Sequence, residues 1–195
     1  MSLVARAQNI IMKPKEEWLV VAQETPDTGK IMTGYVIPLA ILPAVGSLLG
    51  YGLMGLGFKW GIAWAITAAV GAIVGTLVTA FVVDALAPSF GSEKDMGRSM
   101  QLVAYANTPA WVAGILNIIP FLGLVTWIAS LYGIYLLYLG LSPVKKTPED
   151  KRVIYTIVAL VITFAVNALF AVVIGGILVT LFVGAAATGA AVGGF

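Results

Sequence analysis

Long apolar stretches alternate with short polar segments along most of this chain, and this alternation sets the first expectation for its fold. Each apolar stretch is at least about as long as the ~20 residues that a helix needs to cross the hydrocarbon core of a bilayer. The sequence therefore predicts an all-α, polytopic membrane protein with five transmembrane helices. The expected spans cover approximately residues 31–58, 60–86, 97–119, 121–141 and 152–183, which form a membrane domain over residues 31–183.

The segment that precedes the first span, residues 1–30, mixes apolar with charged side chains. This pattern is typical of one or two short amphipathic helices that lie in the membrane interface on the cytoplasmic side, and Pro14 divides them. Trp18 is expected to anchor this arm in the interface. A partly disordered tail is the alternative. Residues 1–10 lack the apolar core of a cleaved signal peptide, so we expect the first span to direct insertion.

Prolines and glycines predict where the spans bend and where they pack. Two prolines in the first span, Pro38 and Pro43, should kink it. Small residues spaced four apart allow close contact between apolar helices, and they also provide faces through which copies of the chain could associate. These small-residue pairs are Gly46 with Gly50 and Gly71 with Gly75.

The ends of the last two spans are also read from proline and glycine. Pro143 and Pro148 are expected to prevent the fourth helix from continuing beyond residue 141. Gly175 and Gly176 mark a bend in the fifth apolar stretch, which is longer than one span needs. Residues 184–195 then form a small-residue C-terminal tail at or beyond the far surface.

Composition agrees with the membrane class and removes several kinds of chemistry. The chain is 60% hydrophobic and 10% charged, against about 25% charged residues in a typical soluble domain. It contains neither cysteine nor histidine. Disulfides, Cys/His zinc sites and Ser-His or Cys-His nucleophiles are therefore excluded. We identify no catalytic, cofactor-binding or metal site, and the low, dispersed positive charge argues against nucleic acid as a partner.

Basic residues divide very unevenly between the two sides of the predicted layout. Ten of the eleven lysines and arginines fall in the N-terminal arm and in the loops after the second and fourth spans. The other side receives only Lys59. Because positive charge marks cytoplasmic loops, the N-terminus is predicted to be cytoplasmic and the C-terminus outside. All nine acidic residues fall on the cytoplasmic side as well, so soluble protein partners should come from there.

Several short motifs follow one another in a recognisable order in the centre of the chain. They are an acidic helix end at Asp84 followed by Pro88, Phe90 and Gly91, then Tyr105 with Asn107-Thr108-Pro109, then Ile119-Pro120-Phe121-Leu122-Gly123, then Tyr132-Gly133-Ile134-Tyr135 with Leu139-Gly140. In this order and spacing the chain resembles the Yip family, named for proteins that interact with Ypt/Rab GTPases, and in particular its prokaryotic branch. With the five-span layout, the resemblance covers nearly the whole chain.

The resemblance implies a non-enzymatic integral membrane protein that organises membranes or interacts with proteins or lipids. Eukaryotic members are implicated in Rab-linked trafficking and membrane shaping in early secretory membranes. This chain lacks the Asp-Leu-Tyr-Gly-Pro motif of the eukaryotic cytosolic arm, so the resemblance does not carry Rab binding over to it. The prokaryotic branch implies location in the inner or plasma membrane of a prokaryotic cell.

Polar residues inside the apolar stretches are the candidate functional positions. Asp84 ends the second span, where a carboxylate near hydrocarbon indicates either a functional site or an interfacial group paired with Lys94 or Arg98. Asn107 and Thr108 are expected to bond carbonyl groups that Pro109 leaves free, and Tyr105 could share their cavity.

These residues also define an alternative function. A polar track from Asp84 through Asn107 to Asn167, in the middle of the fifth span, would favour a small transporter or channel. An ordinary interhelical hydrogen bond is the other interpretation of Asn167.

The densest group of basic residues gives a candidate lipid contact. Four cations beside the polar loop after the fourth span could attract anionic lipid head groups, although setting the topology is a sufficient role for them. These residues are Lys145, Lys146, Lys151 and Arg152. Membrane lipids, a second copy of the chain and a cytoplasmic protein are thus the expected partners.

Overall fold

The computed structural model of the chain describes residues 1–53, 57–169 and 172–173, and the regular structure within them is helical. A further helix follows α8 and lies within Glu149–Leu169. Part of the stretch 152–183, the bend at Gly175 and Gly176, and the tail 184–195 lie outside the described residues. The labelled helices are α1 Leu3–Met12, α2 Pro14–Gln23, α3 Thr28–Ile31, α4 Ile37–Leu53, α5 Phe58–Leu86, α6 Met96–Ala106, α7 Thr108–Ala113 and α8 Gly123–Lys145.

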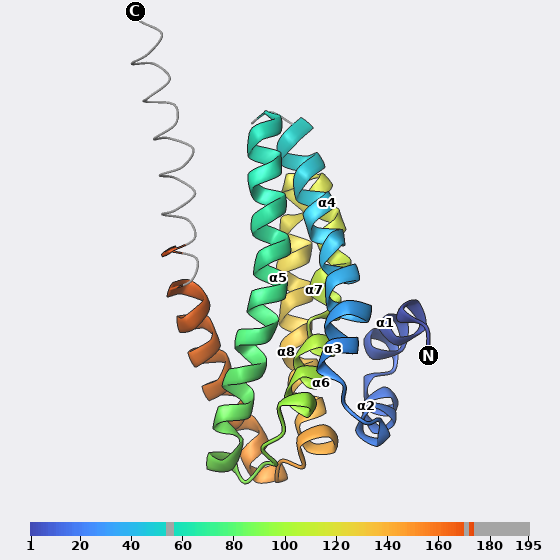
Figure 1. Cartoon of the computed structure of the whole chain (residues 1–195), viewed down its shortest axis with the longest axis vertical. Coiled ribbons are helices and arrows are strands. Elements are labelled where there is room, and N and C mark those ends of the chain that lie inside the picture. Colours follow the sequence, from blue (N-terminus) through green and yellow to red (C-terminus); the bar gives the residue numbers. More distant parts are fainter. Residues whose placement is uncertain (54–56, 170–171, 174–195) are drawn as a thin grey trace, which may run out of the picture.

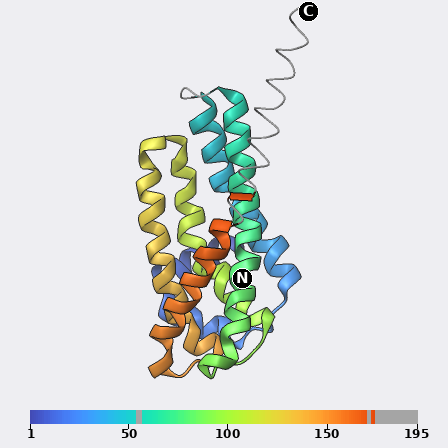
Figure 2. The same ribbon diagram turned by 90° about the vertical axis from the view of Figure 1, so that its left-hand side faces the viewer.

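The long helices lie side by side and connect one end of the molecule to the other (Figure 1). The chain rises through α4, descends through α5, rises again through α6 and α7, and descends through α8. Figure 2 shows the hairpin that leads into α8, in yellow, beside the α4–α5 hairpin, in cyan and green. Helices α1 and α2 flank the lower half in Figure 1, at the end where the polar loops gather.

Four helices among the described residues are long and apolar enough to cross a membrane. These helices are Thr28–Leu53, Phe58–Phe90, Gly123–Lys145 and Glu149–Leu169. The expected third helix over 97–119 is divided instead: α6 ends at Ala106, α7 begins at Thr108, and a 3₁₀ helix, Gly114–Ile118, completes the segment. Pro109 explains the break, because its ring clashes with the carbonyl four residues earlier and it has no N–H to donate. The count of five spanning helices is therefore not confirmed.

The first span accommodates its prolines within one continuous helical path. Helix α3 passes into a π-helical turn, Met32–Val36, which leads into α4. The Ile37 N–H bonds the carbonyl of Met32, five residues earlier, just before Pro38. A wider turn of this kind re-satisfies backbone groups that a proline disturbs. Pro43 lies inside α4.

The small-residue face of Gly46 and Gly50 makes the close contact that the sequence predicts. A Cβ at Gly46 would lie 3.0 Å from the carbonyl oxygen of Ile115 and closer still to that of Gly114. A Cβ at Gly50 would collide with the carbonyl oxygen of Asn117. Only glycine lets α4 approach the 3₁₀ helix Gly114–Ile118 this closely.

Helix α8 is longer than the sequence predicted. It passes through Pro143 and ends at Lys145, so the expectation that Pro143 stops it is wrong. Pro143 removes only its own hydrogen bond to the carbonyl of Leu139, and the helix continues for only two more residues. Lys146 then adopts the left-handed conformation, with φ of 52°, and its N–H bonds the carbonyl of Leu141.

The N-terminal helices pack against the other helices through one face each. Helix α1 buries Arg6, Ala7 and Ile10, and α2 packs on α8. The prediction that Trp18 anchors the arm in the membrane interface is wrong, because this side chain is only 1% exposed and lies over Gly140 of α8. The same three-to-four spacing of apolar residues suits a lipid surface and a helix surface equally well, and here the partner is protein.

Candidate functional site

Three helices meet at a buried ion pair at the loop end of the molecule. Lys145, the last residue of α8, places its Nζ 3.1 Å from Oδ1 of Asp84 on α5. Its ammonium also donates to Oγ of Ser99 on α6, at 2.7 Å, and to the carbonyl of Asp95, at 3.0 Å. Lys145 is fully buried and Asp84 is 8% exposed. The cluster therefore joins α5, α6 and α8 at one point.

The ammonium of Lys145 has an acceptor for each of its three donors. Ser99 Oγ also donates to Oδ1 of Asp84 at 3.1 Å, so this oxygen accepts from two side chains. A buried ion pair held in this way is a structural contact, since the ammonium has no donor left for a ligand. Asp84 is thus paired as the interfacial interpretation expects, but with a different partner from Lys94 or Arg98.

The sequence did not reveal Lys145 as the partner of Asp84, because the two residues lie far apart along the chain. Lys145 is 61 residues from Asp84, and it sits at the end of an apolar helix that was expected to stop earlier. Arg98, one of the two expected partners, donates instead to the carbonyl of Val21 at 3.2 Å. Lys145 was also expected to contact anionic lipid, but its fully buried side chain presents no charge to a head group.

Around the ion pair, further contacts hold the two polar loops together. Ser92 and Thr147 share a hydrogen bond of 2.6 Å between their hydroxyl groups, and the Glu93 N–H donates to the carbonyl of Lys145 at 3.0 Å. Tyr155 stacks on Phe90 with ring centroids 4.7 Å apart and donates its hydroxyl to the carbonyl of Val83. The loop after α5, the loop after α8 and the following helix are thereby tied to one another.

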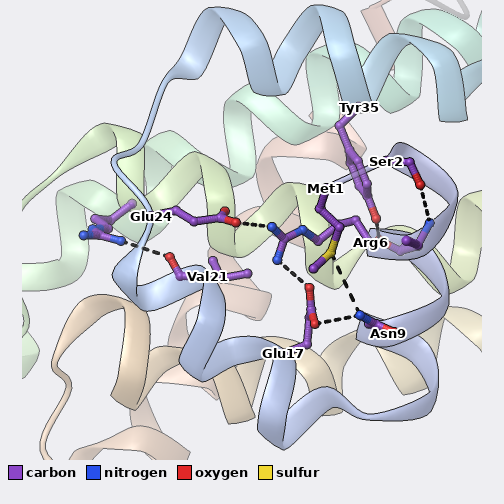
Figure 3. Close-up of polar contacts among 11 residues, drawn as sticks. Met1, Ser2, Arg6, Asn9, Glu17, Val21, Glu24 and Tyr35 are labelled. Atoms are coloured by element: carbon purple, nitrogen blue, oxygen red, sulfur yellow. Dashed lines mark hydrogen bonds and ion pairs between the residues drawn. The ribbon is translucent and has the colours of Figure 1, made fainter.

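A second buried polar cluster fixes the N-terminal arm, and Figure 3 shows it. Arg6 of α1 lies between Glu17 of α2 and Glu24 and forms an ion pair with each. Asn9 donates to the other oxygen of Glu17 at 3.1 Å. The Arg6 guanidinium lies 5.2 Å from the centre of the Tyr105 ring on α6, so the cluster also contacts the membrane-length helices.

The break between α6 and α7 carries the candidate residues Tyr105, Asn107 and Thr108. Thr108 Oγ1 donates to the carbonyl of Tyr105 at 2.7 Å, and this carbonyl is the one that Pro109 prevents from accepting a helical N–H. This is the bond that the structural interpretation of Thr108 expects. Tyr35 also shares a hydrogen bond of 2.7 Å with Thr108 Oγ1. The rings of Tyr35 and Tyr105 meet edge to face at 4.8 Å.

A hollow of about 380 Å³ lies beside this group, between the arm and the first span. Arg6, Glu24, Lys30, Tyr35 and Tyr105 are among its lining residues. Asn107 itself is the residue that joins α6 to α7, and its N–H donates to the carbonyl of Val103 at 3.1 Å. Tyr105 and Thr108 are thus brought together, while Asn107 contributes a backbone hydrogen bond at the end of α6.

The three residues of the expected polar track have separate local partners. Asp84 bonds Lys145 and Ser99, and Asn167 donates to the carbonyl of Thr163, one turn earlier in its own helix, at 2.9 Å. Asp84, Asn107 and Asn167 do not line the hollow between the arm and the first span. The expected track from Asp84 through Asn107 to Asn167 therefore stays a prediction.

The remaining basic residues lie at the surface near the loop after α8. Lys146 is exposed and pairs with Glu93 at 2.6 Å, and Lys151 is exposed. Arg152 pairs with Glu149 at 3.1 Å, and its guanidinium lies 4.9 Å from the centre of the Tyr138 ring. Among the described residues, no group of three or more acidic side chains is arranged to hold a metal ion.

The long apolar helices and the polar groups buried at one end define a helical integral membrane protein. Residues 9–170 match the model of the Yip1 domain, and the chain therefore belongs to the Yip1-domain family. No curated protein and no solved structure matches the chain.

Proposed function

We propose that this protein is a non-enzymatic scaffold of the Yip type that crosses the cell membrane five times and organises it through lipid and protein contacts on the cytoplasmic side. The observation that carries the proposal is that the buried charges are paired, with the partly exposed Glu24 as one of the partners. Asp84 with Lys145, and Arg6 with Glu17 and Glu24, satisfy one another across helices. Groups held in this way stabilise a fixed surface and are poorly suited to proton transfer.

The fifth passage through the membrane would be the divided segment. Helix α6 packs against α5 and α8, and α7 with the 3₁₀ helix Gly114–Ile118 continues upward between α4 and α8 (Figures 1 and 2). Non-helical hydrogen bonding is tolerated at membrane depth where the backbone is covered by protein. The close contacts of this segment with Gly46 and Gly50 provide such a cover.

The proposed orientation places the polar loops and the N-terminal arm in the cytoplasm. The uneven distribution of basic residues supports this orientation. Large apolar side chains such as Phe81, Trp127 and Phe164 are more than half exposed, and in this layout they would face lipid. In the proposed layout, α1 and α2 would lie against the protein at the level of the lipid head groups.

The topology can be mapped by labelling single cysteines, since the chain has none of its own. Lys13→Cys and Lys146→Cys should react with a membrane-impermeant maleimide only after the cells are permeabilised. Lys59→Cys, the same substitution on the other side, should react in intact cells. Labelling of Lys59→Cys and Lys146→Cys from the same compartment would contradict the five-pass layout.

The scaffold role itself is tested by crosslinking in native membranes. We expect a short amine- or photo-reactive crosslinker to capture a second copy of the chain or a cytoplasmic protein. A Cβ at Gly71 meets nothing within 4 Å, so this end of the small-residue face on α5 is open for such an association, whereas a Cβ at Gly75 would contact Asn167. Recovery of the uncrosslinked monomer alone would contradict the proposal.

A further inference from the structure

A second hollow lies between α2, the last turns of α8 and the start of the helix that follows. Its volume is about 510 Å³, and Lys15, Leu19, Tyr138, Leu139 and Arg152 are among the residues that line it. Trp18 also lines it. This hollow is separate from the two buried polar clusters, since neither Lys145 nor Arg6 lines it.

Two buried N–H donors on the lining residues lack an acceptor. Nε1 of Trp18 and Nε of Arg152 have no hydrogen-bond partner among the described residues. Trp18 is only 1% exposed, so its indole lies beneath the surface of the hollow, whereas the Arg152 side chain is 17% exposed. Buried donors are nearly always satisfied in folded proteins, so the hydrogen bonding of these two lining residues is incomplete.

The charge of the hollow specifies an anion. Its lining contains the cations of Lys15 and Arg152 and no acidic residue. The Arg152 guanidinium is held in place by the Tyr138 ring, 4.9 Å away, and by Glu149. The Glu149 side chain is itself 83% exposed, so this carboxylate lies toward solvent. An oxyanion with several acceptor oxygens matches this set of donors.

The apolar part of the lining indicates that the anion belongs to an amphiphile. Leu19 is 60% exposed, and Val20 beside it is 41% exposed. Leu139 continues the apolar surface on α8. In the proposed layout this surface lies at the cytoplasmic membrane interface, where acyl chains begin below the head groups.

We propose that this hollow binds the phosphodiester of an anionic glycerophospholipid from the cytoplasmic leaflet. Lys15 and Arg152 contact the phosphate, and Leu19 and Leu139 contact the acyl chains. The inference rests on the proposed membrane location. Of the four basic residues that the sequence offers as lipid contacts, Arg152 is the one that lines this hollow.

The test measures lipid retention by native mass spectrometry of the full-length protein in a neutral detergent, titrated with phosphatidylglycerol or phosphatidylcholine. Wild type should retain phosphatidylglycerol preferentially. The double variant Lys15→Gln/Arg152→Gln should bind it about thirtyfold more weakly, as expected for the loss of two cations at a membrane surface. The matched control, Lys13→Gln/Lys151→Gln, removes two exposed cations that do not line the hollow and should bind like wild type.

Inorganic phosphate should not displace the lipid, because it cannot contact Leu19 and Leu139.

Three results would overturn the proposal. Equal loss in the site variant and the matched control would show diffuse attraction to surface charge, and equal retention of the two lipids would show contact with acyl chains alone. Displacement by millimolar inorganic phosphate would identify a soluble anion as the ligand. Detergent micelles have no sidedness, so failure here leaves the cysteine-labelling result, and with it the proposed topology, unaffected.

Discussion

Single residues determine which helices meet at the loop end. Sequence reasoning correctly anticipated that Thr108 would bond a carbonyl next to Pro109, because the proline frees a backbone group within a few residues. It could not find the pairing of Asp84 with Lys145. Such a contact depends on where two distant helix ends arrive, and one local window of sequence contains only one of them.

Replacing Lys145 by methionine should destabilise the protein by about 3–5 kcal/mol, because the buried Asp84 carboxylate loses its cation. The expected result is a lower unfolding midpoint of the purified protein in detergent. Adding Asp84→Asn to the same chain should recover part of the loss, since the amide is uncharged.

Lys146→Met is the matched control, because it makes the same change at the exposed pair with Glu93. Its effect should stay within about 0.5 kcal/mol. If Lys146→Met lowered the midpoint as much as Lys145→Met, the buried pair would have no special role in stability.

Among the secondary-structure elements, the sequence predicted the long helices well and their interruptions poorly. Hydrophobic length located α4, α5 and α8 because a membrane-length helix needs a long apolar run, which is visible in any window. Proline was less informative. Pro109 divides a helix, whereas Pro43 and Pro143 each lie within one, so a proline by itself does not locate a helix end.

Gly50→Ala should weaken the contact between α4 and the 3₁₀ helix Gly114–Ile118, because the added Cβ would collide with the carbonyl of Asn117. Overpacking of this kind costs about 1–3 kcal/mol, which would appear as a lower unfolding midpoint in detergent. Gly71→Ala is the control, since a Cβ there meets nothing within 4 Å and alanine favours helix by about 1 kcal/mol. A lower midpoint for Gly71→Ala than for Gly50→Ala would contradict the packing described here.

In the whole molecule, the N-terminal arm is part of the packed structure. The sequence identified its two helices but assigned their apolar face to lipid, because amphipathic spacing does not reveal which surface covers it. Trp18 packs into the core, and Tyr132 of α8 donates its hydroxyl to the carbonyl of Ile11 in α1 at 2.8 Å. These contacts, together with the Arg6 ion pairs, hold the arm in place.

Arg6→Met should release the arm without unfolding the long helices. Glu17, whose side chain is 5% exposed, would lose its cation, and a buried carboxylate without a partner favours the open arm. Hydrogen exchange should become faster in α1 and α2 and stay unchanged in α5 and α8. The exposed Lys13→Met is the control and should leave exchange unchanged, and equal protection of the arm in both variants would show that other contacts suffice.

The pairing of Asp84 with Lys145 has a consequence for biosynthesis. The ribosome completes the lysine 61 residues after the aspartate, an interval of about 3–12 s at ~5–20 residues per second. Until then Asp84 has no cation with which to form its buried ion pair. The end of α5 should therefore stay at the exit of the translocon until α8 has been synthesised. Nascent chains truncated before Lys145 should therefore be extracted from membranes by alkaline carbonate more readily than chains that extend just beyond it.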